Sequence, residues 1–353
     1  MKEQLKKFPK INLINLPTPL EFAGNLTRKL NGPQLFFKRD DETGLAFGGN
    51  KSRKLEYILP EAVDRQSDVL ITFGSIGSNH TRLTAAAARK LGMDSVLVMC
   101  GNKPNEIQGN LRIEQVLGAE IRLIDEDPSD FFKRNTASPG LVETILHDIV
   151  EEKLKEGRKP FIVPPAGFCP LGAISYANAA MEMVMQMAAL GRRIDAVVVA
   201  AGSGGTYAGL SLGVKALSPH TQVIGGEISG IRSLPALTER VVDIADQAAS
   251  ALGIDTRLEA ANVELYDCSG EGYPIPSSEG YKAMTLTAES EGILLDASYT
   301  AKTMACFIDL IAKKRFKSNE TIVFVHTGGA PALFSDTTLI ENLPKNGISI
   351  INA

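Results

Sequence analysis

Short apolar runs alternate with amphipathic segments along most of the chain. Strands that read as continuous apolar runs are buried on both faces, so the alternation with helical segments predicts an α/β fold with parallel sheets. Strands are expected at residues 35–38, 69–73, 96–99, 121–124, 161–163, 196–200, 223–228 and 322–325. Helices are expected at residues 55–63, 79–91, 111–117, 131–154, 171–190 and 206–217.

The alternation divides into two series at Pro164-Pro165 and Gly167. We therefore expect two open parallel-sheet domains, a small one at residues 52–164 and a large one formed by residues 1–51 and 165–353. Ligands of α/β proteins bind outside the carboxyl ends of the strands. The junction of the two sheets is the place where a cofactor is expected.

Composition excludes several functions. The chain has 353 residues, 44% of them hydrophobic, with a net charge of −4 and no long basic cluster, so no nucleic-acid partner is expected. No segment approaches the roughly 18 apolar residues of a membrane span, so a cytoplasmic protein without a membrane partner is expected. The four cysteines and four histidines are scattered, and neither a disulfide framework nor a metal site is predicted.

Lys51 follows two glycines at the start of an amphipathic segment. A helix N-terminus disfavours positive charge, so a merely structural cation is out of place there. Desolvation and the neighbouring cations Arg53 and Lys54 are expected to lower the pKa of the amine, as an imine-forming lysine needs. The alternative is a solvated lysine beside a flexible turn.

Residues 202–206, Gly-Ser-Gly-Gly-Thr, lie between a buried strand and a helix. Small residues and a helix N-terminus make this turn a phosphate-binding cup. A dinucleotide site is an alternative. Tyr207 takes the place of the third glycine, which counts against it, whereas Glu227 lies at a plausible ribose-binding distance at the end of the next strand. A serine hydrolase is another, with Ser203 as nucleophile and Asp267 and His326 following in the expected order.

Two weaker features lie later in the chain. Thr327 follows a late strand and precedes two glycines, where its hydroxyl could bond the nitrogen of an aromatic ring or simply cap a helix. Tyr273 and Tyr299 lie in polar turns and could transfer a proton if a nearby cation lowered their pKa. Tyrosines at domain edges more often pack with the hydroxyl in water.

Together these features resemble a pyridoxal-phosphate enzyme of the tryptophan-synthase-β-like fold. The closer resemblance is to the aminocyclopropane-carboxylate deaminase and D-cysteine desulfhydrase family. It covers nearly the whole chain in order and spacing. The matching segments are Pro17-Thr18-Pro19-Leu20, Phe37-Lys38-Arg39-Asp40-Asp41, Gly48-Gly49-Asn50-Lys51, Ser78-Asn79-His80, Gly272-Tyr273 and residues 326–333.

The resemblance implies a role for each matching position. Lys51 would carry pyridoxal 5'-phosphate covalently, and Asn79 would bond the phenolic oxygen of the cofactor ring. The cofactor phosphate would lie on the turn formed by Gly202, Ser203, Gly204, Gly205 and Thr206, with help from Lys54. Ser78, Asn79, His80 and Gly77 would receive a small amino-acid substrate, which Tyr273 and Tyr299 would face. The resemblance also implies a homodimer.

Two positions separate the branches of this family. The deaminase branch has glutamate and leucine where this chain has Thr300 and Thr327. A carboxylate at the ring nitrogen makes a strong electron sink, which cyclopropane opening needs, whereas a hydroxyl suffices when a good leaving group departs from Cβ. The chain therefore resembles the desulfhydrase branch, in which the freed Lys51 removes the α-proton of D-cysteine and pyruvate, ammonia and sulfide are released.

Gly77 stands where the family usually has glutamine, and Glu271 and Pro274 flank Gly272-Tyr273 where the desulfhydrases tend to have other residues. A small residue at position 77 is expected to enlarge the substrate pocket. L-cysteate, which would release sulfite, is therefore an alternative substrate, and aminocyclopropane-carboxylate deamination is a second alternative.

Overall fold

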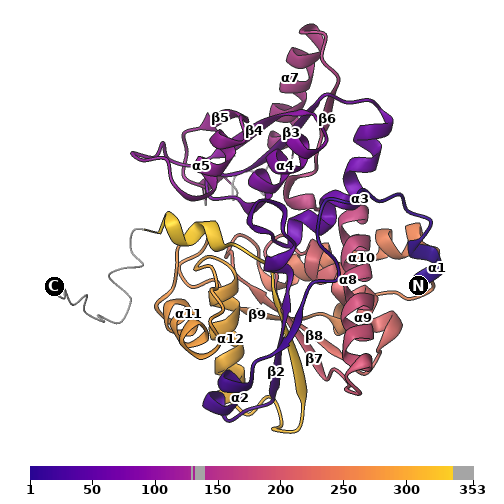
Figure 1. The fold of residues 1–353 in the computed structure, drawn as a ribbon, viewed down its shortest axis with the longest axis vertical. Coiled ribbons are helices and arrows are strands. Elements are labelled where there is room, and N and C mark those ends of the chain that lie inside the picture. The colour runs from indigo at the N-terminus through magenta and orange to yellow at the C-terminus, as the bar shows by residue number, and fades with distance from the viewer. Residues whose placement is uncertain (129, 132–139, 337–353) are drawn as a thin grey trace, which may run out of the picture.

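The computed structural model describes residues 1–128, 130–131 and 140–336 and contains two β-sheets (Figure 1). The larger sheet has six strands in the order β1-β2-β10-β7-β8-β9, and the smaller has four in the order β5-β4-β3-β6. The strands are β1 (Leu20–Phe22), β2 (Gln34–Arg39), β3 (Val69–Ser75), β4 (Asp94–Cys100), β5 (Glu120–Ile124), β6 (Pro160–Ile162), β7 (Ala196–Ala200), β8 (Gln222–Glu227), β9 (Glu264–Asp267) and β10 (Thr321–His326).

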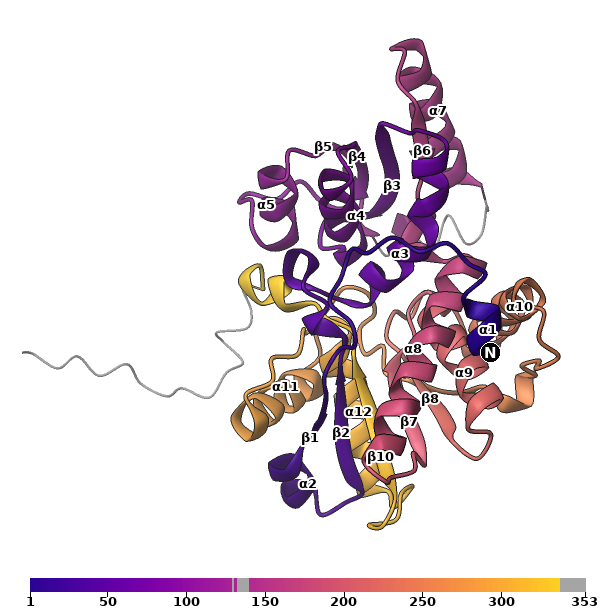
Figure 2. The same ribbon diagram turned by 45° about the vertical axis from the view of Figure 1, so that its right-hand side comes forward.

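Helices cover both sheets. They are α1 (Lys2–Leu5), α2 (Gly24–Leu30), α3 (Asn50–Asp64), α4 (Asn79–Lys90), α5 (Gly109–Val116), α7 (Leu141–Lys155), α8 (Pro170–Ala189), α9 (Gly205–Leu217), α10 (Leu234–Leu252), α11 (Ser278–Glu291) and α12 (Thr300–Ala312). In Figure 2, α8, α9 and α10 lie on one side of the six-stranded sheet, and α2, α11 and α12 lie on the other. The apolar core is divided between these two faces.

The expected α/β class is confirmed, and a strand is present at every expected position. Pairing is parallel throughout the smaller sheet, whereas the larger sheet carries one antiparallel edge strand, β1, which the apolar pattern did not predict. The helix expected at 131–154 is present as α7 from Leu141, and residues 132–139 lie outside the described residues. The four strands of the smaller sheet fall within residues 52–164, but the domain boundaries themselves stay a prediction.

Helix α3 joins the two sheets through a buried polar cluster on its first turns. Arg53 donates hydrogen bonds to both carboxylate oxygens of Asp40, at 3.0 and 2.8 Å, and to both of Glu182, at 3.1 and 2.9 Å. Burial alone would raise the pKa of Asp40, but the charge of Arg53 holds it below its usual range. Tyr176 donates to the same carboxylate at 2.6 Å. The start of α3 is thereby fixed against β2 and α8.

The described helices include none with the length and apolar character needed to cross a membrane.

Candidate active site

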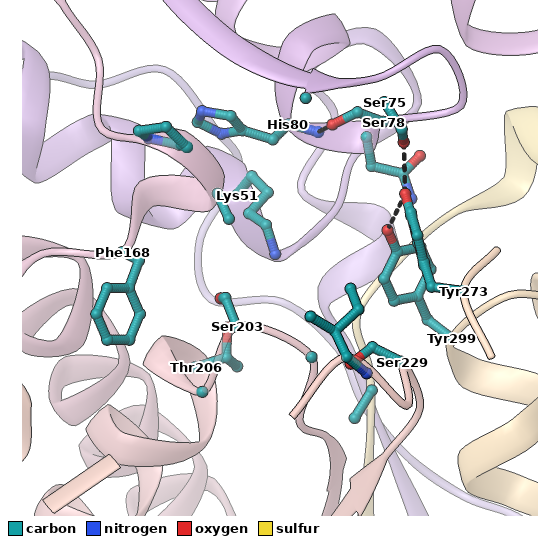
Figure 3. Close-up of a pocket in the computed structure, with 18 of the residues that line it drawn as sticks. Lys51, Ser75, Ser78, His80, Phe168, Ser203, Thr206, Ser229, Tyr273 and Tyr299 are labelled. Atoms are coloured by element: carbon teal, nitrogen blue, oxygen red, sulfur yellow. Dashed lines mark hydrogen bonds between the residues drawn. The ribbon is translucent and has the colours of Figure 1, made fainter. Parts of the chain in front are cut away.

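A cavity of about 480 Å³ lies where the carboxyl ends of strands from both sheets meet. The smaller sheet contributes Ser75 at the end of β3 and Pro164 after β6, and the larger contributes Ala200 at the end of β7 and Thr327 after β10. This is the place at which parallel α/β sheets bind ligands. The expected junction site is therefore present as a cavity (Figure 3).

Lys51 lies in the first turn of α3 and points into the cavity (Figure 3). The preceding Gly48 has a φ of 65°, and a Cβ there would meet the Asp41 carbonyl oxygen at 1.9 Å, so only glycine allows this approach. The Asn50 amide then donates to the Thr327 carbonyl at 3.0 Å, which ties this turn to the end of β10.

Burial lowers the pKa of the Lys51 amine to about 8. The shift has the expected direction, but burial is its only cause. Neither Lys54 nor Arg53 contributes to it, and the guanidinium of Arg53 is paired with Asp40 and Glu182. An amine with a pKa near 8 is partly neutral at physiological pH and can act as a nucleophile or a base.

The turn at residues 202–206 faces Lys51 across the cavity. Gly202, Ser203, Gly204 and Thr206 line the cavity, and Gly205 begins α9. Asn50 donates from its side-chain nitrogen to the Thr206 hydroxyl at 3.0 Å, so the lysine turn and the glycine turn are held together. Figure 3 shows Ser203 and Thr206 below Lys51, with Phe168 beside them.

Lys54 is buried beside this turn, just outside the residues that line the cavity, and its amine can pair with an anion bound there. Its Nζ atom lies 3.2 Å from the position of a Cβ built on Gly205 and donates to the Ala166 carbonyl at 3.2 Å. Burial and the charge of Lys51 lower its pKa well below the usual value, and no carboxylate of the described residues lies within ion-pair distance. A buried cation of this kind is stabilised by a bound anion. The residues present therefore fit a cofactor phosphate.

Ser78, Asn79 and His80 form the opposite wall at the start of α4. The Ser78 hydroxyl accepts hydrogen bonds from the amides of His80 at 3.2 Å and Thr81 at 3.4 Å, so it caps the helix. A helix N-terminus at a cavity wall attracts a carboxylate. His80 contacts the Thr72 hydroxyl at 2.9 Å, and burial together with Lys51 and Lys54 lowers its pKa to about 3, so the imidazole is neutral.

Three hydroxyl groups form a chain at the far end of the cavity (Figure 3). Tyr299 donates to the Tyr273 hydroxyl at 3.0 Å, and the Tyr273 and Ser75 hydroxyls are hydrogen-bonded to each other at 2.5 Å. Burial raises the pKa of both tyrosines, so the condition that a nearby cation lowers their pKa is not met. Both phenols stay protonated at neutral pH and can donate a proton or a hydrogen bond.

The structure does not bring every predicted residue to the cavity. Thr327 lines it, and its hydroxyl makes no hydrogen bond with a described residue. Thr300 is fully buried outside the lining, where its hydroxyl donates to Asp296 at 2.7 Å. Gly77 also lies outside the lining, and a Cβ there meets open space, so the structure does not connect this glycine with a larger pocket.

The residues of the alternative sites are not brought together. His326 is fully buried, with one ring nitrogen 2.9 Å from the Leu294 carbonyl and the other accepting from the Gly328 amide. Asp267 accepts from Ser269 instead, so a hydrolase triad with Ser203 is not formed. Glu227 accepts hydrogen bonds from the backbone amides of Ser229 and Gly230 at 2.9 Å. Its carboxylate therefore has partners within the protein and needs no ribose to explain its position.

The sequence did not predict several residues that line the cavity, among them Phe168, Arg232 and Arg240. Ser75 belongs to the segment 74–80, which the sequence places in the wall of the site, but no role was predicted for its hydroxyl. Phe168, Arg232 and Arg240 had no signal of their own, because they reach the cavity from loops and from α10. Arg240 lies over the Phe168 ring, 3.6 Å from its centroid, and donates to the Ser203 carbonyl at 3.3 Å.

The site thus combines a buried lysine of lowered pKa with a glycine turn and a second buried lysine on the opposite side. This arrangement is typical of a pyridoxal-phosphate enzyme built on two α/β sheets. Comparison with known proteins gives the same class, since a family model described as pyridoxal-phosphate dependent enzyme matches residues 11–328. The chain belongs to this family, and its cofactor is pyridoxal phosphate.

Individual relatives carry two different activity names. A D-cysteine desulfhydrase from Klebsiella pneumoniae is 39% identical, over 94% of this chain and 98% of the relative. A putative 1-aminocyclopropane-1-carboxylate deaminase from Pyrococcus horikoshii is 37% identical, over 94% of each chain. A solved structure titled as an ACC deaminase homologue superimposes with a TM-score of 0.86 at 35% identity, over 97% of this chain and 98% of that one.

Proposed function

We propose that this protein is a pyridoxal-phosphate-dependent lyase that removes the β-substituent of a small sulfur-containing amino acid, with D-cysteine as the substrate. The reaction would be D-cysteine and water giving pyruvate, ammonia and hydrogen sulfide. The similarity to proteins named D-cysteine desulfhydrase supports this proposal. The observation that carries it is that Thr327 lines the cavity, whereas Glu143 is the only carboxylate among the described lining residues.

The polarity of the cavity favours β-elimination over ring opening. Among the described residues that line the cavity, Glu143 at the start of α7 is the only carboxylate, and it is exposed at the rim. The group expected at the ring nitrogen is the hydroxyl of Thr327. A hydroxyl does not keep a pyridine nitrogen protonated, so the site suits a substrate whose leaving group departs readily from Cβ.

The cofactor, when bound, supplies an electron sink for the charge that develops at the substrate α-carbon. Asn79 is proposed to bond the phenolic oxygen of its ring, and Lys54 with residues 202–206 its phosphate. The start of α4, with Ser78, holds the substrate carboxylate through the helix dipole. Together these contacts orient the α-hydrogen toward Lys51.

Proton transfer is assigned to two groups of this chain. Lys51, with a pKa near 8, accepts the α-proton as a neutral amine. Tyr299 and Tyr273 are protonated and lie at the end of the cavity opposite Ser203 (Figure 3), where one phenol can donate a proton to the departing sulfur. Ser75 holds the Tyr273 hydroxyl in place.

Aminocyclopropane-carboxylate deamination is the second candidate, because relatives with that name have similar identity. L-cysteate, with sulfite as the leaving group, is the third. A homodimer and a cytoplasmic location stay predictions from the resemblance and the composition.

A panel of amino acids tests the proposal. Purified holoenzyme is incubated with D-cysteine, L-cysteine, L-cysteate and 1-aminocyclopropane-1-carboxylate, and sulfide, sulfite, pyruvate and 2-oxobutanoate are measured. Sulfide and pyruvate from D-cysteine in equal amounts are expected, with a higher kcat/KM than for any other compound. Release of 2-oxobutanoate as the preferred reaction would overturn the proposal, and preferred sulfite release would replace D-cysteine by L-cysteate.

A further inference from the structure

Asn110 lies behind the wall that carries Asn79, at the start of α5. It is only 2% exposed and does not line the cavity. Its side-chain nitrogen donates two hydrogen bonds, one to the Gly77 carbonyl at 2.8 Å and one to the Asn79 side-chain oxygen at 3.0 Å. Both acceptors belong to the loop that leads from β3 into α4. One amide group therefore holds this loop at two points.

These contacts fix which way the two amides face. The Gly77 carbonyl can only accept, so Asn110 must turn its NH₂ group toward the loop. This orientation leaves the side-chain oxygen of Asn110 buried, without a hydrogen-bond partner among the described residues. Arg82, which can only donate, lies 3.4 Å from the same oxygen of Asn79. Two donors therefore hold the Asn79 oxygen.

The orientation determines what Asn79 offers to the cavity, which it lines. With its oxygen held by Asn110 and Arg82, the remaining polar group of the side chain is its NH₂, and this nitrogen bonds no described residue. An NH₂ group can only donate. The partner of Asn79 inside the cavity must therefore be an acceptor, such as an oxyanion.

We infer that Asn110 is a positioning residue, which holds the Asn79 amide so that it donates to the phenolic oxygen of the bound cofactor. The inference rests on the cofactor placement proposed above. A donor at the phenolic oxygen stabilises its anionic form. With the cofactor bound, this donor would therefore lower the pKa of the proton between this oxygen and the Lys51 nitrogen. The pH midpoint of the visible absorption band of the bound cofactor reports that proton.

Two substitutions at position 110 test the inference by spectroscopy. Asn110→Asp keeps the size of the side chain, but an ionised carboxylate can only accept and turns the Asn79 oxygen toward the cavity. Asn110→Leu removes the donor and leaves Asn79 free to rotate. The expected shift of the midpoint is upward, by about 1 pH unit or more for Asn110→Asp and less for Asn110→Leu. The cofactor dissociation constant should rise about tenfold in Asn110→Asp.

Glu114→Gln is the matched control. Glu114 lies one turn further along α5 and accepts from the Thr81 hydroxyl at 2.6 Å, and it makes no hydrogen bond with Asn79. Burial raises the pKa of its carboxyl to about 8, against the effects of Thr81 and Arg82, so glutamine resembles the form present at neutral pH. The pH midpoint of the absorption band should be the same in this variant as in the wild-type protein.

Asn79→Ala separates the role of Asn110 from the placement of the cofactor. If Asn79→Ala raises the midpoint while both Asn110 variants leave it unchanged, the role of Asn110 is overturned and the cofactor placement stands. If Asn79→Ala itself leaves the midpoint unchanged, Asn79 does not donate to the phenolic oxygen, and the proposed placement is wrong. A loss of stability without a shift of the midpoint means that Asn110 is only structural and overturns the inference.

Discussion

The ammonium nitrogen of Lys54 lies 3.2 Å from the point at which a side chain on Gly205 would begin. Lys54 is fully buried, and its one hydrogen bond to a described residue is to the Ala166 carbonyl. Glycine at position 205 thus leaves room for the lysine at the start of α9. The contact places a lysine amine and a helix N-terminus at the same point, so that a phosphate bound there would pair with the charged form of Lys54.

Lys54→Met should therefore have opposite effects on the cofactor and on the empty protein. Loss of a charge-assisted hydrogen bond of about 1.5–3 kcal/mol should raise the dissociation constant of pyridoxal phosphate roughly 10- to 150-fold. The midpoint of thermal unfolding of the apoprotein should rise, because an apolar side chain replaces a buried amine whose charged form is disfavoured by burial and by Lys51. Fluorescence titration and calorimetry measure the two effects. Pyridoxal, which has no phosphate, is the control ligand and should bind both proteins equally well.

The lowered pKa of Lys51 predicts the pH dependence of cofactor attachment. Only the neutral amine attacks an aldehyde, and raising the pH through about 8 converts the ammonium to this form. The rate at which apoprotein takes up pyridoxal phosphate should increase with pH and level off above a midpoint of about 8. An exposed peptide lysine, whose pKa is about 10.4, is the comparison. A midpoint near that value would show that the amine is solvated.

Tyr299→Phe should lower kcat with little effect on cofactor binding. The substitution removes the hydroxyl that donates to Tyr273 and leaves the aromatic ring in place. Loss of a general acid lowers kcat about 10²-fold or more. Tyr207→Phe removes a hydroxyl that donates to the Val223 carbonyl outside the cavity, and should cost about 1 kcal/mol of stability without a change in kcat. Equal activity of the two variants would contradict a catalytic role for Tyr299.

Much of the fold was predictable because the strands are buried on both faces. All seven residues of β3 are buried, so the apolar run at 69–73 had no other explanation. Edge strands β1 and β9 were missed, since each is short and only partly buried. Helix α10 was missed although its buried positions follow a helical spacing.

The site was predictable only where chain neighbours act together. Lys51 and residues 202–206 are local motifs, and glycine marks both. The Ser75 and Tyr273 hydroxyls meet across 198 residues of sequence, and Thr18, Arg53 and Glu182 meet through three separate segments. Such contacts follow from how the two sheets are placed, and no local spacing encodes them. Thr300 lies outside the cavity lining for a local reason, since its hydroxyl donates to Asp296 four residues earlier.

Arg53→Met tests whether the buried cluster beneath Lys51 holds the two sheets together. The variant leaves Asp40 fully buried, with the hydroxyls of Thr18 and Tyr176 but without the guanidinium. Removing one partner of a buried ion pair costs about 3–5 kcal/mol, so urea unfolding should occur at a much lower concentration. Arg65→Met is the control, because Arg65, which directly follows α3, forms an exposed ion pair with Glu61 of that helix, and such pairs contribute about 0–1 kcal/mol. Similar losses of unfolding free energy in the two variants would show that the cluster contributes no more than a surface pair.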